Sequence, residues 1–205
     1  MPNHYSLEEF IEEVRAAVSK HLPAGDTLRS LTPGFKKLLN NRSFLQEKLK
    51  ALNIVGDEVC LYRDPEHRFS ILARGVSHEA KRQGQSHAGT PHDHGNLWAL
   101  YGIYEGTAHF QRYQVDPANR KGPFPGLQLI SDEPAKAGDV DAIEPGNMHL
   151  PVFPQGGEVI IVVYGGMLEM VVRRGYLRDI EQPVEFRGLF ASSETRVDQA
   201  PSSAP

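Results

Sequence analysis

The chain has 205 residues, of which 40% are hydrophobic and 23% are charged, enough apolar material for one sizeable folded domain. Its 22 Lys and Arg stand against 26 Asp and Glu, giving a net charge of −4. This weak acidity argues against nucleic acid or an anionic membrane surface as the main partner.

Cys60 is the single cysteine, so no intrachain disulfide can form. A lone strand cysteine is usually a small core residue, and Cys60 is expected to be one. The first residues carry neither a basic nor an apolar signal-peptide pattern, and no apolar run reaches the roughly 20 residues that span a bilayer. We therefore expect a cytoplasmic protein, as a monomer or homodimer.

The N-terminal part, residues 1–54, is predicted to be a helical segment packed on the outside of the remaining chain. Ser6 and Glu9 form a capping-box pattern, and an apolar stripe then predicts a helix over 6–21. Pro23 and Gly25 end this helix. A second helical pattern covers 35–52, with a break expected near Asn40 and Asn41.

From about residue 55 the apolar pattern changes to short strands separated by turn residues. The predicted strands are 58–62, 69–75, 97–104, 107–115, 127–130, 140–143, 149–153, 158–164 and 167–173. Such spacing without intervening helices predicts a fold that is all-β with N-terminal helices, its strands forming a closed or sandwiched antiparallel barrel over 55–190. Residues 191–205 have the composition of a disordered tail.

Three histidines carry the chemistry that the sequence offers. His92 and His94, two residues apart in an extended segment, project from the same face, and His149 on a later strand could complete a three-nitrogen metal site. Asp93 between them is expected to point away and anchor the loop. His78 and His87, in the polar stretch 76–91, are expected to be solvated.

These motifs resemble those of the cupins. His92-x-His94 followed by Gly106 is similar to the first cupin motif, and Gly138-Asp139 with Pro145-Gly146-x-x-His149 is similar to the second. The resemblance implies a cupin-type jelly-roll β-barrel, also called a double-stranded β-helix, with a metal in its mouth. The first motif usually adds a glutamate ligand, but Trp98 and Ala99 stand there, and Phe153 replaces a frequent asparagine.

The stretch from Thr90 to Trp98 resembles the thiol dioxygenases, of the cysteine and 3-mercaptopropionate dioxygenase type, whose iron is held by three histidines. That resemblance implies His92, His94 and His149 as ligands of Fe(II), with Zn, Mn or Ni as alternatives. It also implies oxidation of a small thiol, cysteine-like or mercapto-acid-like, to a sulfinate with O2.

The same resemblance suggests further site residues. Tyr164 fits the tyrosine of a Ser-x-His-x-Tyr pattern, although Ile160 and Val162 replace the serine and histidine. Arg63 stands where the cysteine enzymes carry an arginine that binds the substrate carboxylate; Arg74 and Arg112 are further candidates. Ala99 occupies the position of a cysteine that cross-links to the tyrosine in some relatives, so no cross-link is expected.

Two other functions are compatible with the sequence. A cupin lyase, isomerase or hydrolase could use the same three histidines to hold a Lewis-acid metal. A non-catalytic cupin could instead bind a small molecule and dimerise through an edge strand. The substituted Ile160 and Val162 favour the first alternative, and the absent glutamate favours thiol oxidation.

Overall fold

The computed structural model describes residues 5–43, 45, 58–75, 89–154 and 158–187. Two helices precede the strands, α1 (Leu7–Val18) and α2 (Ala24–Asn40). The predicted capping box of α1 is confirmed, because the Glu9 N–H donates to Ser6 Oγ at 3.1 Å and the Ser6 N–H donates to the Glu9 carboxylate at 2.7 Å. The helix therefore begins where the sequence predicts.

The second helix is placed differently from the prediction of 35–52. It begins at Ala24, directly after Pro23, and ends at Asn40. Proline is compatible with a helix start, because the backbone N–H groups of the first turn have no acceptor inside the helix, and a residue without an N–H therefore loses no hydrogen bond there. A buried stripe then continues through the helix despite Gly25 and Pro33. The helix ends at the break expected near Asn40 and Asn41, while residues 46–52 lie outside the described residues.

In the described part of the chain, ten strands follow the helices. Their bounds are β1 (Glu58–Arg63), β2 (Ser70–Gly75), β3 (Ala99–Glu105), β4 (Thr107–Val115), β5 (Leu127–Lys136), β6 (Val140–Ile143), β7 (Met148–Val152), β8 (Val159–Tyr164), β9 (Val172–Leu177) and β10 (Gln182–Arg187). The prediction of 127–130 is too short, because β5 is ten residues long and nine of them pair with β4. The prediction of 167–173 is also misplaced, since a 3₁₀ turn at Leu168–Met170 comes before β9. β10 was not predicted.

The strands form a jelly roll. One sheet has the order β1-β2-β8-β3-β6, and a second has the order β5-β4-β7. Isolated bridges through His92 connect β7 to β9, which pairs with β10. The described strand pairs are all antiparallel. One sheet contributes β2, β8, β3 and β6, and these face the His92 segment, β7, β4 and β5. This strand order is that of two interlocked Greek keys. The predicted all-β fold with N-terminal helices and a jelly-roll barrel is confirmed.

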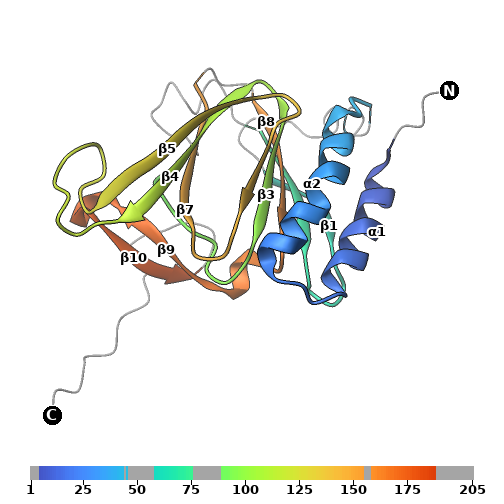
Figure 1. Cartoon of the computed structure of the whole chain (residues 1–205), viewed down its shortest axis with the longest axis horizontal. Helices are drawn as coiled ribbons and strands as arrows, with labels where there is room; N and C mark the ends of the chain where they lie inside the picture. Colours follow the sequence, from blue (N-terminus) through green and yellow to red (C-terminus); the bar gives the residue numbers. More distant parts are fainter. Residues whose placement is uncertain (1–4, 44, 46–57, 76–88, 155–157, 188–205) are drawn as a thin grey trace, which may run out of the picture.

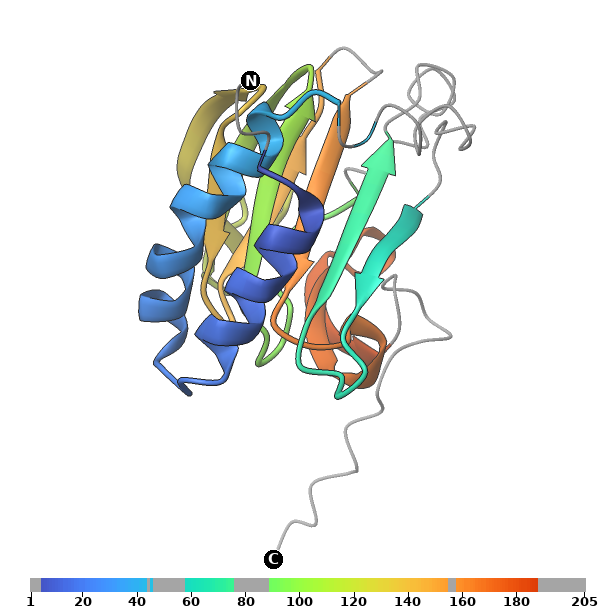
Figure 2. The ribbon, with the colours of Figure 1, turned by 90° about the vertical axis from the view of Figure 1, so that its right-hand side faces the viewer.

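Strand β8 divides the core into two parts. Its alternate residues Val159, Ile161 and Val163 face the helices, whereas Ile160, Val162 and Tyr164 face the barrel interior. Figure 2 shows α1 and α2 side by side across the outer face of the larger sheet, and Figure 1 shows the smaller sheet on the opposite side. Both faces of this sheet are therefore covered.

Gly102 of β3 permits the close approach of α2 to the sheet. A Cβ atom at this position would lie 2.5 Å from the side chain of Leu39 and 2.8 Å from that of Phe35. The glycine thus brings the helix onto the strand that also carries Tyr101 into the barrel.

Cys60 is exposed on β1, so its expected place in the core is wrong; β1 lies at the edge of its sheet and pairs, among the described strands, with β2 alone. Within the described residues, no helix is long and apolar enough to cross a membrane. The boundary between 1–54 and 55–190 stays a prediction, and the tail 191–205 lies outside the described residues.

Candidate metal centre

The three histidines come from two segments that pair through their backbones. The His92 N–H donates to the His149 carbonyl at 2.9 Å, and the His149 N–H returns the bond to the His92 carbonyl at 2.8 Å. His149 lies on β7, and His94 follows His92 by two residues, so all three side chains enter the same end of the barrel. The predicted grouping of His92, His94 and His149 is present in the structure.

The ligand nitrogens of the three rings lie within 4.8 Å of one another. The Nε2 atoms of His94 and His149 are 3.3 Å apart. Two nitrogens that each bind one ion at about 2.0–2.1 Å are separated by roughly 3 Å, so this spacing fits a shared ion. Among the described residues, the group contains no carboxylate and no cysteine.

Burial keeps these imidazoles neutral. Burial lowers the pKa of His92 to about 4, and lowers the pKa of His94 and His149 well below the ordinary value. Within the described residues, the buried Nδ1 atoms of His94 and His149 have no hydrogen-bond partner. The Nδ1 atom of His92 bonds to the Thr90 carbonyl at 3.0 Å, which leaves its Nε2 unprotonated. Neutral, converging and otherwise poorly satisfied imidazoles fit a transition-metal ion.

Asp93 anchors the loop between the two ligands, as expected. Its buried carboxylate accepts from the Arg174 side chain at 2.6 Å, the Arg174 N–H at 2.8 Å and the Gly95 N–H at 3.0 Å. Gly95 has a φ of 62°, and a Cβ there would lie 2.4 Å from the Val172 carbonyl oxygen. Only glycine allows the chain to turn this closely past β9.

Two tyrosine hydroxyls complete the cluster. Tyr164, predicted as a site residue, lies inside the barrel with its hydroxyl 2.9 Å from that of Tyr101. The Tyr101 hydroxyl is also 3.2 Å from His94 Nε2. The sequence motifs do not single out Tyr101, which lies in the predicted strand 97–104. Tyr101 of β3 lies directly opposite Val162 of β8, so the two side chains project from the same face of the sheet.

The arginines lie in different surroundings. Arg63 is half-exposed, and its Nη1 atom is 2.6 Å from Glu169; the described contacts do not bring it to the cluster, and its role stays a prediction. Arg74 is directly opposite the inward-facing Ile160, and forms an ion pair with Glu58. Arg173, which the sequence did not single out, is buried, with its guanidinium 4.4 Å from the Phe186 ring centroid.

Arg74 and Arg173 act electrostatically on the histidines. Their positive charges are among the causes that lower the pKa of His92 and His94, after the effect of burial. Burial lowers the pKa of Arg173, whereas the neighbours of Arg74, including Glu58, outweigh burial and raise its pKa. Both guanidinium groups therefore disfavour protonation of the histidine cluster.

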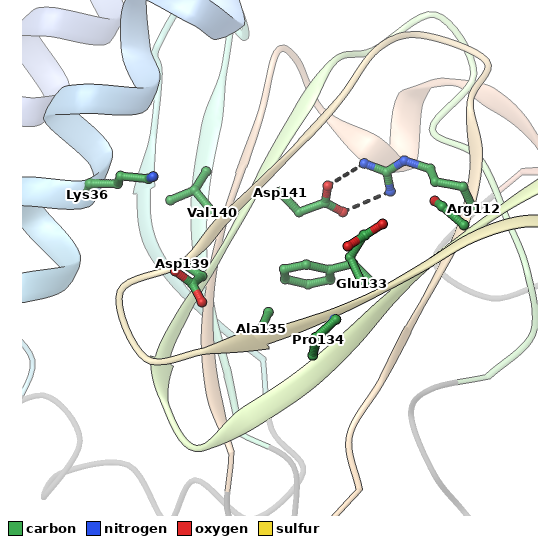
Figure 3. Close-up of a pocket in the computed structure, with 10 residues that line it drawn as sticks. Lys36, Arg112, Glu133, Pro134, Ala135, Asp139, Val140 and Asp141 are labelled. Atoms are coloured by element: carbon green, nitrogen blue, oxygen red, sulfur yellow. Dashed lines mark hydrogen bonds and ion pairs between the residues drawn. The ribbon is translucent and has the colours of Figure 1, made fainter.

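Arg112 and Asp141 form a further ion pair beside the cluster. Arg112 Nη1 donates to Asp141 Oδ2 at 2.8 Å, and Nη2 donates to Oδ1. Figure 3 shows this pair at a cleft of about 390 Å³ between the strand edges. Its lining residues are Lys36, Phe110, Arg112, Ser131, Glu133, Pro134, Ala135, Asp139, Val140 and Asp141.

Comparison with known proteins adds little beyond this geometry. No protein-family model matches the chain, and no curated protein sequence does. Among solved structures, a cupin-2 domain containing protein from Shewanella frigidimarina shares 14% identity with a TM-score of 0.39, covering 63% of this chain and 99% of its own. KdgF from a Halomonas species shares 14% identity over 56% and 83% of the two chains, with a TM-score of 0.37.

A sugar phosphate isomerase from a cupin superfamily, from Silicibacter pomeroyi, shares 15% identity over 67% and 71% of the two chains, with a TM-score of 0.37. These values are too low to carry an argument about family or activity. The fold rests on the strand order, and the metal centre rests on the three histidines.

Proposed function

We propose that this protein is a cupin and a non-haem Fe(II) dioxygenase that oxidises the sulfur of a small thiol to a sulfinate. Both atoms of O2 enter the product, because a thiol and O2 together have the composition of a sulfinic acid. The observation that carries the proposal is the group of three neutral imidazoles without a carboxylate among the described residues. A bound Fe(II) ion would supply the redox chemistry with O2.

The charge of the ligand set supports an anionic substrate. Three neutral imidazoles leave the full charge of a divalent ion uncompensated, whereas a glutamate ligand would offset part of it. His92, His94 and His149 would hold the ion, and a thiolate would provide the missing negative charge. Arg74 and Arg173 add further positive charge near the ligands, which also favours an anionic substrate.

The tyrosine pair supplies hydroxyl groups at the site. Tyr101 replaces the hydrogen-bonding support that Ile160 and Val162 cannot give, because its hydroxyl lies 2.9 Å from that of Tyr164. In this proposal Tyr101 orients Tyr164, and Tyr164 donates a hydrogen bond to the reacting group. The unusual partner explains how the tyrosine keeps a fixed position without the Ser-x-His pattern.

A carboxylate on the thiol substrate would be bound by arginine. Arg74 and Arg173 are better placed for this than Arg63, since Arg74 lies opposite an inward-facing residue and Arg173 is buried. Arg63 remains a candidate on the ground of its resemblance to the arginine of the cysteine enzymes. The preferred substrate class is therefore a mercapto acid or cysteine-like thiol.

A second candidate function is Lewis-acid chemistry, as a lyase, isomerase or hydrolase with Zn, Mn or Ni. Ile160 and Val162 favour it, because thiol dioxygenases carry serine and histidine at those positions. Two adjacent tyrosine hydroxyls could serve as a proton donor and acceptor in such a reaction. A non-catalytic cupin that binds a small molecule is the third alternative.

The deciding experiment is oxygen uptake by the Fe(II)-loaded protein with cysteine, 3-mercaptopropionate, cysteamine and mercaptosuccinate. We expect uptake with at least one carboxylated thiol, formation of the sulfinate in a 1:1 ratio to O2, and weaker uptake with cysteamine, which has no carboxylate. No uptake with any of the four, from protein that binds the metal, would contradict thiol oxidation and favour the Lewis-acid alternative.

Steady-state kinetics with the carboxylated substrate can distinguish which arginine binds its carboxylate. Arg74→Gln is expected to raise KM about tenfold or more, as expected for a lost charged hydrogen bond, with metal content unchanged. Arg63→Gln is the matched control from the neighbouring strand β1, and we expect a smaller effect. A raised KM for Arg63→Gln alone would instead assign the carboxylate to Arg63.

A further inference from the structure

The Arg112–Asp141 ion pair connects the two sheets next to the metal ligands. Arg112 of β4 lies directly opposite His149 of β7, and Asp141 of β6 lies directly opposite Tyr101 of β3. Residues directly opposite one another in a sheet project from the same face. Both partners of the ion pair therefore project from the faces that carry the metal cluster, one from each sheet.

The ion pair borders the cleft of about 390 Å³. Both side chains line the cleft and are 20% and 12% exposed, and Figure 3 shows the guanidinium and the carboxylate in direct contact with each other. Arg112 Nη2 also donates to the Ala142 carbonyl at 3.2 Å, which fixes the guanidinium on β6. The charged groups thus have defined positions close to His149.

Arg112 places a permanent positive charge beside a site for a divalent cation. Its charge acts on both His94 and His149. A metal ion would experience the same repulsion with twice the charge, and partial burial reduces the screening by water. Asp141 is the group that offsets this charge, because its carboxylate contacts both nitrogens of the guanidinium end.

We propose that Arg112 and Asp141 are positioning residues that set the metal affinity of the three-histidine site through their balanced charges. Asp141 allows the dication to bind beside Arg112, and Arg112 prevents the carboxylate of Asp141 from moving to the metal as a fourth ligand. The site thereby keeps three neutral ligands. This inference rests on the metal-binding part of the proposed function and is independent of the reaction.

The charge model predicts opposite effects for the two partners. Asp141→Asn leaves Arg112 uncompensated and should weaken Co(II) and Zn(II) binding about tenfold or more. Arg112→Gln leaves a carboxylate near the ligands and should strengthen binding by a similar factor. The double variant, which has no net charge at this place, should return to within about threefold of the unmodified protein.

The measurement is competition titration with a chromophoric chelator at pH 8, together with the visible spectrum of the Co(II) form. Glu133→Gln is the matched control, since Glu133 lines the same cleft but is exposed. The metal affinity of this variant should equal that of the unmodified protein. The spectrum of Arg112→Gln should change if Asp141 becomes a ligand. Asp141→Glu, which keeps the charge, should retain near-normal affinity.

A merely structural ion pair predicts a different result. Each single variant would then weaken binding, in proportion to its loss of thermal stability, and the double variant would not recover. That result overturns the proposal, and so does unchanged affinity in both single variants. If Asp141→Asn does not fold, Arg112→Gln and the double variant still show whether removal of the Arg112 charge strengthens or weakens metal binding. Failure of thiol oxidation with the predicted affinities would refute the proposed reaction and leave this inference standing.

Discussion

Tyr101 lies on β3 with its side chain in the barrel interior. Its hydroxyl contacts both His94 and Tyr164, so it connects one of the three clustered histidines to the second hydroxyl of the site. The sequence places Tyr101 on an apolar strand, but its pairing with Val162 of β8 depends on the register between strands far apart in the chain. Register is a tertiary property, and a shift of one residue would turn Tyr101 away from the barrel interior.

Tyr101→Phe removes this connection with little change in volume. We expect the Fe(II)-loaded variant to bind a normal amount of metal, but kcat for thiol oxidation should fall about tenfold, because Tyr164 loses its only hydroxyl neighbour among the contacts described. Steady-state oxygen uptake and metal analysis measure the two quantities.

Tyr62→Phe is the control for Tyr101→Phe, since the Tyr62 hydroxyl contacts Arg15 of α1 on the outer side of the sheet. An equal loss of kcat in both variants would show a general effect on the fold. An unchanged kcat in Tyr101→Phe would remove Tyr101 from the proposed mechanism.

The grouping of the three histidines was predictable because its signal is local. His92 and His94 are two residues apart, and the glycine and proline pattern before His149 is short. Asp93 was also predictable, since a residue between two inward-facing ligands must point away from them. Asp141 and Arg173 were not, because only the folded chain brings them to the site.

At the scale of elements, the turn between β1 and β2 depends on one carboxylate. Asp64 is buried, and it accepts from the Glu66 N–H at 3.1 Å and from the Arg68 N–H at 3.3 Å. The Arg68 guanidinium also donates to it, at 3.1 and 3.2 Å. These bonds, with that of the Arg68 side chain the strongest, lower the pKa of Asp64 below the ordinary value.

A lowered folded-state pKa determines the sign of the pH effect. Asp64 stabilises the fold above the ordinary pKa of aspartate, about 3.9, and this contribution is lost as the pH falls through the lower folded-state pKa. Asp64→Asn should therefore reduce the free energy of unfolding at pH 7 by about 1–3 kcal/mol, and by less at pH 3. Urea unfolding at both pH values measures the difference.

Glu66→Gln serves as the control for the turn, because the Glu66 side chain is 72% exposed and should change stability little. A loss for Asp64→Asn that is the same at pH 3 and pH 7 would contradict the assignment of the effect to the ionised carboxylate.

The elements that the sequence misplaced share a physical cause. Glycine and proline usually interrupt helices, yet in α2 the buried stripe from Leu28 to Leu39 outweighs their unfavourable propensities. Strand β10 has mixed polarity, and only its pairing with β9 makes it a strand. Tertiary packing determines both the extent of α2 and the presence of β10, and local composition does not reveal such packing.

The whole molecule has three layers, with the helices on one face of the larger sheet and the smaller sheet on the other (Figure 1). The helices leave the barrel interior free for the histidines, the tyrosines and the Arg112–Asp141 pair. Alternate side chains of β8 face the helices and the barrel interior, so this one apolar strand contributes to both hydrophobic clusters. The class of fold followed from the spacing of the strands, whereas the order of the strands did not.

The central claim is that His92, His94 and His149 bind one divalent metal ion. The most direct test is the metal content of the protein after loading with Fe(II) under anaerobic conditions and removal of free ion, with His149→Ala and the surface variant His109→Ala beside it. We predict one ion per chain in the unmodified protein and in His109→Ala, and almost none in His149→Ala. Equal metal content in all three proteins would contradict the claim.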